Sequence, residues 1–189
     1  MAQEIEIEFK NLITKEEYKK LQQFLHLETT PAIVQTNHYF ETSNFQLKQK
    51  GAALRIREKN NLWQLTLKEP HTDGLLETHD TLTEEEANSW INGDIIPKPQ
   101  VAKQLNQLGI DFAKLNYGGK LETHRQETNY HETTVVLDYN TYNDRVDYEL
   151  ELEAKSYAHG EKIFNDLMEQ QQIPKRKTDN KIKRFYTTL

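Results

Sequence analysis

The first ten residues of the chain alternate charged and apolar side chains with a period of two. Successive side chains of a β-strand point to opposite faces, so a strand over 1–10 gathers its charges on one face. That face carries Glu4, Glu6, Glu8 and Lys10, and the other carries Ile5, Ile7 and Phe9. A half-exposed antiparallel strand gives the same alternation when its polar face meets water. The segment alone therefore predicts a strand and leaves the surroundings of its charged face open.

The alternation recurs along the chain with complementary charges. In 53–57 the charged face is cationic through Arg55 and Arg57, and in 63–68 it ends in Lys68. The segment 146–153 is acidic again, and its charged face carries Asp147, Glu149, Glu151 and Glu153. Like charges along a strand repel, and carboxylates gathered without cations resist ionisation. A polyvalent metal ion held between the two acidic strands would remove this repulsion.

Further strands and helices are predicted between these segments. Thr14 with Glu17 three residues on starts a helix over 14–26, and Thr83 with Glu86 starts one that runs to residue 90. The other helical segments are 97–109, 157–171 and a last turn or two in 179–185. Two of the remaining expected strands contain Arg55 and Lys68 and are joined by a tight turn at 59–61. A strand over 120–130 is expected after a turn at Gly118 and Gly119. The other expected strands are 33–42, which has a short continuation over 44–50, then 74–81, 133–139 and 145–154.

About eight amphipathic strands in 189 residues predict an α+β fold built on a closed antiparallel barrel. The length fits a single domain over 1–189. We expect the apolar strand faces to pack outward against the helices, which leaves the charged faces inside. A charged interior must hold water, ions or a ligand, because buried unpaired charge is costly.

Composition narrows the setting and the partners. The chain has no cysteine, which excludes thiolate metal sites, cysteine nucleophiles and disulfides. No segment has the apolar length of a signal peptide or a membrane span, so we expect a cytoplasmic protein without a membrane partner. The net charge of −6, from 24 basic and 30 acidic residues, argues against binding to nucleic acid. It leaves room for a small polyanion held by a local group of cations.

An ordered set of short motifs resembles the CYTH domain, also called the triphosphate tunnel metalloenzyme superfamily. These motifs are Glu6-x-Glu8-x-Lys10, Tyr39-Phe40-Glu41-Thr42, Leu54-Arg55-Ile56-Arg57, Leu65-Thr66-Leu67-Lys68, Arg125, Glu149-Leu150-Glu151-Leu152-Glu153 and Lys181. The resemblance runs nearly end to end. It implies an eight-stranded antiparallel tunnel that binds a triphosphate and divalent cations. Family members include class IV adenylate cyclases, thiamine triphosphatases and inorganic triphosphatases.

The resemblance and the chemistry of the side chains together indicate candidate site residues. Guanidinium and ammonium groups suit phosphate oxygens, so the expected substrate-binding cations are Lys10, Arg55, Arg57, Lys68, Arg125 and Lys181. Carboxylates suit Mg²⁺ or Mn²⁺, and we expect two ions held by Glu6, Glu8, Glu149, Glu151, Glu153 and Asp138, of which Asp138 resembles the family's strand aspartate. Glu77 would add a further carboxylate. Glu6, Glu8 and Lys10 are the expected catalytic residues, with Lys10 either activating water or holding a phosphate.

Three functions fit these residues. The first is a metal-dependent phosphohydrolase that cleaves inorganic triphosphate or a small organic triphosphate. The second is a class IV type adenylate cyclase that converts ATP to cyclic AMP and pyrophosphate. The third is a non-catalytic module that binds polyphosphate or a nucleotide, although such a module gains nothing from acidic strands beside its ligand. The sequence decides neither the substrate nor the preferred metal, and it leaves a homodimer open.

Overall fold

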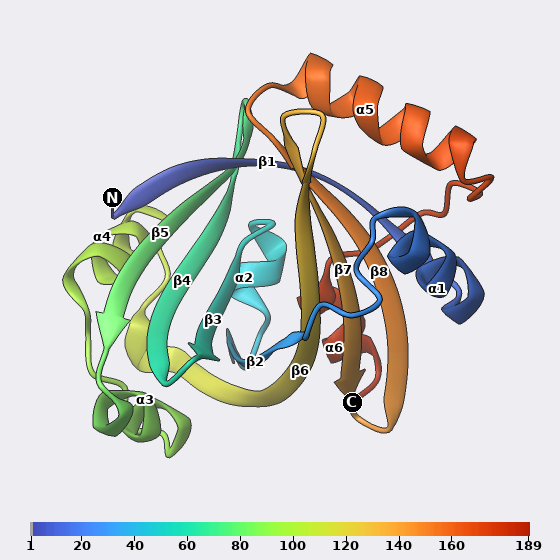
Figure 1. Cartoon of the computed structure of the whole chain (residues 1–189). Helices are drawn as coiled ribbons and strands as arrows, with labels where there is room; N and C mark the ends of the chain where they lie inside the picture. Colours follow the sequence, from blue (N-terminus) through green and yellow to red (C-terminus); the bar gives the residue numbers. More distant parts are fainter. Residues whose placement is uncertain (1) are drawn as a thin grey trace. The chain divides into compact units, whose positions relative to one another are not determined.

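The structure is a computed structural model that describes residues 2–189 (Figure 1). The strands hydrogen-bond in the order β1-β5-β4-β3-β2-β6-β7-β8, which closes on itself into an antiparallel barrel. This confirms the predicted α+β fold class. The strands are β1 (Gln3–Ile13), β2 (Ile33–Thr42), β3 (Ala53–Lys59), β4 (Leu62–His71), β5 (Gly74–Leu82), β6 (Leu115–Tyr130), β7 (Thr133–Tyr142) and β8 (Arg145–Ala154).

The helices begin where the sequence places capping residues. Thr14 and Thr83 each accept a hydrogen bond from the backbone N–H three residues on, and the glutamate at that position bonds back to the cap. Both capping boxes were predicted from the sequence. The helices are α1 (Lys15–Phe24), α2 (Gln46–Gln49), α3 (Glu84–Ile91), α4 (Pro99–Gln107), α5 (Tyr157–Gln170) and α6 (Lys181–Thr187), with a 3₁₀ turn at Phe112–Lys114. Within residues 2–189, none of these helices has the length and apolar character needed to cross a bilayer.

The chain divides into two compact units, and the prediction of one domain over 1–189 stays a prediction. The first unit contains residues 2–5 and Gln35–Leu121. Its strands turn one face toward α3 and α4, and the buried core there includes Leu54, Ile56, Leu65, Leu67, Trp90 and Leu105. The opposite face of β3 and β4 carries Arg55, Arg57 and Lys68. In this unit the apolar faces pack against helices, and the charges lie on the other side.

The second unit contains Glu6–Val34 and Glu122–Leu189 and follows the same plan. The apolar faces of β7 and β8 pack against α1 and α5 (Figure 1), in a core that includes Leu21, Leu137, Leu150, Leu152, Phe164 and Leu167. Gly160 lets α5 approach closely, because a Cβ atom at this position would lie 2.5 Å from Phe9 Cε2 and 2.6 Å from Ala154 Cβ. The acidic face of β8 points away from these helices.

Two local predictions were wrong. The expected strand continuation over 44–50 is the short helix α2, since the Glu41 carboxylate accepts hydrogen bonds from the backbone N–H groups of Leu47 and Lys48 at its start. The expected turn at Gly118 and Gly119 lies inside β6, which already begins at Leu115. Gly119 takes a φ of 130°, which only glycine adopts readily, so the strand changes direction there without ending.

Candidate functional site

The acidic face of the second unit is built by strand register. Lys10 of β1 lies opposite Glu151 of β8, and Asp138 of β7 lies opposite Glu149. Arg125 of β6 in turn lies opposite Asp138. Side chains directly opposite on neighbouring antiparallel strands share a face, so these charges face one another. We call Asp138, Glu149 and Glu151 the carboxylate cluster; the three residues are 0%, 0% and 5% exposed.

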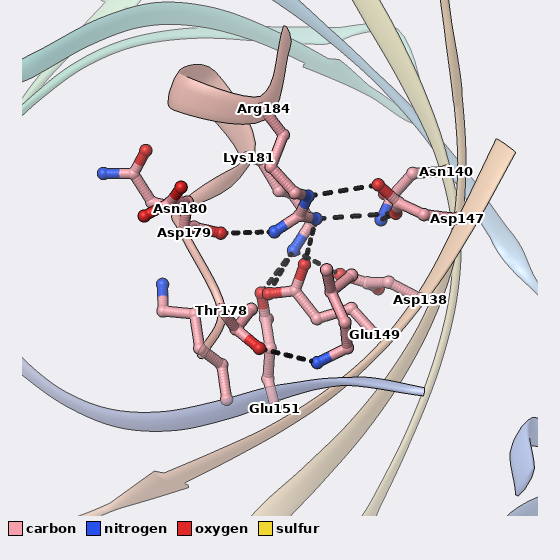
Figure 2. A network of polar contacts seen from close by, with 12 residues as sticks. Asp138, Asn140, Asp147, Glu149, Glu151, Thr178, Asp179, Asn180, Lys181 and Arg184 are labelled. Atoms are coloured by element: carbon pink, nitrogen blue, oxygen red, sulfur yellow. Dashed lines mark hydrogen bonds and ion pairs between the residues drawn. The ribbon is translucent and has the colours of Figure 1, made fainter. Parts of the chain in front are cut away.

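Two predicted cations, Arg125 and Lys181, bind the carboxylate cluster directly, and Figure 2 shows Lys181 beside it. Arg125 donates from Nε and Nη2 to the two Asp138 oxygens at 2.8 and 2.6 Å, and from Nη2 to Glu151 at 2.7 Å. Lys181 of α6 lies with its Nζ 2.9 Å from Asp138 and 3.4 Å from Glu149, and it also contacts Glu151. Each acidic side chain therefore has a cation beside it, which is the condition under which buried charge is tolerated.

A third cation in this network was missed by the sequence analysis. Arg184, one helical turn after Lys181, donates to Glu149 and lies 3.1 Å from Asp147 (Figure 2). Asn140 and Tyr142 donate to the same aspartate at 2.9 and 2.6 Å, which fixes its position. The spacing of three residues between the two cations of α6 is the signal that could have indicated Arg184, because side chains at i and i+3 of a helix share a face.

The electrostatics differ within the carboxylate cluster. Burial raises the pKa of Glu149, and the neighbouring charge of Glu151 adds to this effect. Burial also acts to raise the pKa of Glu151, but Lys181, Arg125 and Lys10 outweigh it and hold that pKa well below its usual range. Glu151 is thus a fixed negative charge. Glu149 is the carboxylate that an additional cation would favour in its ionised form.

The remaining acidic candidates lie along β1 and at the end of the β8 ladder. Lys10 Nζ contacts Glu8 Oε1 at 2.5 Å, and Glu8 lies opposite Glu153. Burial acts against the charge of Lys10, yet Glu8 and Glu151 keep its pKa raised. Glu6 lies two residues before Glu8 on the same strand, so its side chain points to the same face. The register therefore places Lys10 beside the carboxylate cluster and Glu8 beside Glu153, and Glu6 shares their face of β1.

The carboxylate cluster of the second unit supplies oxygen donors, although among the described residues only Glu4, Glu77 and His79 of the first unit bring three ligand atoms within 4.8 Å of one another. The available donors are carboxylate oxygens, which Mg²⁺ and Mn²⁺ prefer. Glu149 Oε1 is buried and accepts no hydrogen bond from residues 2–189, and it lies 3.4 Å from Lys181 Nζ. A buried carboxylate oxygen with this unused capacity is a natural metal ligand.

The predicted cations of the first unit surround a buried carboxylate. Glu77 of β5 lies opposite Lys68, with Lys68 Nζ 2.5 Å and Arg55 Nη2 4.0 Å from its Oε1. Burial acts to raise the pKa of Glu77, but Lys68 and Arg55 lower it to about 2. Arg57 lies on the same face of β3 as Arg55, and its Nε donates to Asn37 Oδ1 at 2.9 Å. Arg55 Nε is buried and makes no hydrogen bond within residues 2–189, so this guanidinium keeps a donor for a ligand.

His79 joins two carboxylates in the first unit, although the sequence analysis passed over the scattered histidines. Its Nε2 lies 3.0 Å from Glu4 and 3.3 Å from Glu77, and its Nδ1 lies 2.9 Å from the Thr66 hydroxyl. One ligand atom of each of Glu4, Glu77 and His79 falls within 4.8 Å of the other two, which is close enough to hold a metal ion. Glu77 and His79 share a face of β5 because they are two residues apart, while Glu4 comes from the neighbouring strand β1, a pairing that sequence spacing does not show.

Comparisons with known proteins agree with this architecture. The CYTH domain model matches residues 4–186. A protein of Bacillus subtilis (strain 168) named "Putative triphosphatase YjbK" is 47% identical over 186 residues, which cover 98% of this chain and 96% of that protein. A Bacillus halodurans protein, whose crystal structure is described as that of a "putative adenylate cyclase", is 41% identical with a TM-score of 0.94, covering 98% of this chain and 100% of that one.

A more distant structure has the same fold. The Hippeastrum protein HpAC1 is 21% identical, with a TM-score of 0.77 over 97% of this chain and 96% of that one. At this identity the likeness concerns the fold alone. The match to the CYTH model and the 47% identity to the Bacillus subtilis protein confirm the resemblance that the strand motifs indicated. The chain belongs to the CYTH domain family.

Proposed function

We propose that the protein is a divalent-metal-dependent phosphohydrolase that cleaves inorganic triphosphate or a small organic triphosphate. The observation that carries this proposal is the carboxylate cluster, which is buried on the same strand face as Lys10 and Arg125 and contacts Lys181 of α6. A site that only trapped polyanions would not need buried carboxylates beside its cations. A site that binds a phosphate chain together with metal ions needs both.

The cations are proposed to bind and orient the phosphate chain. Arg55, Arg57 and Lys68 in the first unit, and Lys10, Arg125 and Lys181 in the second, are the proposed substrate-binding residues. Guanidinium groups suit phosphate oxygens bidentately, whereas lysines act as point charges. In the structure these cations neutralise acidic side chains, as Arg125 neutralises Asp138 and Lys68 neutralises Glu77. A phosphate chain would therefore compete with carboxylates that are already in place.

The proposed metal ligands are Glu6, Glu8, Glu149, Glu151, Glu153 and Asp138. Two Mg²⁺ or Mn²⁺ ions held there would supply charge neutralisation at the phosphates and a more acidic water. The residues of the chain prepare this site: Arg125 and Lys181 hold Asp138 and Glu151 in position, and Arg184 holds Glu149. Lys10, kept protonated by Glu8 and Glu151, cannot accept a proton from water at neutral pH, so its role in the proposal is to hold a phosphate oxygen.

Cyclase chemistry is the second candidate, because the Bacillus halodurans relative at 41% identity is described as a "putative adenylate cyclase". The same cations and carboxylates would then hold ATP, whose 3′-hydroxyl would attack the α-phosphate and release pyrophosphate. The hydrolase takes precedence because the Bacillus subtilis relative, named "Putative triphosphatase YjbK", is 47% identical. The products separate the two reactions.

The test is a panel of tripolyphosphate, thiamine triphosphate and ATP assayed with Mg²⁺ and with Mn²⁺. We expect orthophosphate release from at least tripolyphosphate, and no release with any divalent cation would contradict the hydrolase. Cyclic AMP and pyrophosphate from ATP would support the cyclase, and tripolyphosphate binding without turnover would support a non-catalytic module. The variant E6Q/E8Q should lose turnover and still bind tripolyphosphate in calorimetry. The matched control E84Q/E85Q, at exposed positions of α3, should keep both.

A further inference from the structure

A pocket of about 250 Å³ lies in the second unit between α1 and the strands β6, β7 and β8. Its lining residues are Lys15, Tyr18, Lys19 and Gln22 from α1, and His124, Tyr139 and Tyr148 from the strands. Tyr139 and Tyr148 pack against the apolar core that α1 covers. The pocket is therefore on the helix side of the sheet, and none of its lining residues belongs to the proposed triphosphate site.

Strand register places this pocket directly behind the carboxylate cluster. His124, Tyr139 and Tyr148 lie opposite one another across the three strands. An adjacent residue on each strand points to the other face, and these residues are Arg125 after His124, Asp138 before Tyr139 and Glu149 after Tyr148. A molecule in the pocket is separated from the carboxylate cluster by the sheet itself. Binding in the pocket can therefore be told apart from binding at the carboxylate cluster.

The floor of the pocket is aromatic. The ring of Tyr148 lies 5.0 Å from that of Tyr18 and 5.2 Å from that of Tyr139, and the Tyr139 ring lies 5.6 Å from the imidazole of His124. Such spacings are those of interacting aromatic pairs, and a further planar ring can join them. The hydroxyls of these tyrosines make no hydrogen bond within residues 2–189, which leaves them available to a ligand. Burial, and then the charge of Asp138, raises the pKa of Tyr18 to about 12, so this hydroxyl is a neutral donor.

The rim of the pocket is cationic. Lys15 and Lys19 are four residues apart on α1, so their side chains share a face of the helix. Both are exposed, and neither forms an ion pair with any residue in the described part of the chain. Two unpaired ammonium groups above an aromatic floor favour a ligand that combines a planar ring with a negative charge. They disfavour a cationic ligand.

We propose that this pocket is a second ligand site, specific for a small aromatic anion whose ring lies against Tyr139 and Tyr148 and whose phosphate or carboxylate contacts Lys15 and Lys19. Its volume is below the range of about 300 to 1,000 Å³ that is usual for drug-sized ligands, so the ligand is small. A nucleoside monophosphate and an aromatic carboxylate share this chemistry. The proposal does not depend on the triphosphatase reaction.

The test is a titration of the full-length protein, labelled at the tyrosine rings, with AMP and separately with 4-hydroxybenzoate in NMR at constant ionic strength. We expect saturable shifts of the Tyr139 and Tyr148 ring signals, assigned with Y139F and Y148F. Saturation by AMP would identify the phosphate source and saturation by 4-hydroxybenzoate the carboxylate source. Adenosine, which has the ring without the charge, should bind at least about tenfold more weakly than AMP, the loss expected for a charge-assisted contact.

Two variants locate the binding. K15Q/K19Q should weaken the anion about tenfold, whereas the matched control K155Q/K162Q, at exposed lysines near and on α5, should not. E151Q should leave the tyrosine shifts unchanged, because Glu151 lies on the other face of the sheet. The proposal is overturned if neither anion shifts the two tyrosines, if adenosine binds as well as AMP, if K15Q/K19Q binds like its control, or if E151Q abolishes the shifts. None of these readouts uses turnover, so failure of the triphosphatase assay has no bearing on them.

Discussion

Replacing Lys181 by methionine removes one positive charge from the carboxylate cluster and keeps most of the side-chain volume. Lys181 is 11% exposed in its side chain, and its Nζ contacts Asp138, Glu149 and Glu151. Removing one partner of a buried ion pair costs about 3 to 5 kcal/mol of unfolding free energy, because it leaves uncompensated charge behind. In a chain of this size that loss corresponds to a fall in Tm of roughly 6 to 20 °C.

The assay is urea and thermal unfolding of K181M followed by circular dichroism at neutral pH, with EDTA present to remove divalent cations. The matched control is K183M on the same helix, where Lys183 pairs with Asp179 and its side chain is 45% exposed. An exposed pair of this kind contributes at most about 1 kcal/mol. K181M should therefore unfold well before K183M.

Divalent cations provide the second part of this prediction. Loss of Lys181 leaves Asp138, Glu149 and Glu151 with one neighbouring cation fewer. A bound Mg²⁺ or Mn²⁺ ion then competes with less positive charge for these carboxylates. Binding to the folded state raises the unfolding free energy by about 2.7 kcal/mol at a hundredfold excess over Kd. Mn²⁺ should consequently recover more stability in K181M than it adds to the unmodified protein. Equal stabilities of K181M and K183M in EDTA would refute the reasoning.

Three further predictions concern the substrate site, the pH dependence and the helix packing. R57A should raise the KM for tripolyphosphate about tenfold, as expected for one charge-assisted contact, and an unchanged KM would remove Arg57 from the site. Burial, and then the charge of Lys120, lowers the pKa of His38 to about 4 in the folded protein. As the pH falls below about 6.5, His38 therefore becomes protonated in the unfolded chain but stays neutral in the folded one. Unfolding free energy should fall by on the order of 3 kcal/mol between pH 6.5 and 4, and H38Q should flatten that dependence; an identical slope in H38Q would contradict the assignment. G160A should lower the unfolding free energy by about 1 to 3 kcal/mol in urea unfolding, because the added methyl meets Phe9 and Ala154, and an unchanged midpoint would show that α5 can move away.

The alternation of charged and apolar residues was enough to predict the barrel and the face on which the candidate residues lie. Alternation follows from the two-residue repeat of side-chain direction along a strand, so each segment shows it without information from the rest of the chain. The acidic segment 146–153 thus indicated which side chains of β8 share a face, and the structure places them on one face. The two capping boxes could be predicted for the same reason, because each joins residues only three positions apart.

Contacts that depend on how distant segments meet could not be predicted. Arg184 reaches Glu149 because of where α6 packs, and nothing near residue 184 in the sequence indicates that position. His79 meets Glu4 through the pairing of β5 with β1, whereas Glu77 lies two residues before His79 on β5 itself. The helix α2 replaced a predicted strand because Glu41 caps it across six residues, which a search for period-two alternation does not detect.

The central claim is that the carboxylates of β1 and β8 hold divalent metal ions while cations on the same strand faces hold a phosphate chain. The most direct measurement is the anomalous scattering of Mn²⁺ in crystals grown with tripolyphosphate. The account predicts manganese peaks in direct contact with Glu149 or Glu151 oxygens and phosphate density against Arg125 or Lys181. Manganese bound only at exposed carboxylates, with no phosphate density at these cations, would contradict it.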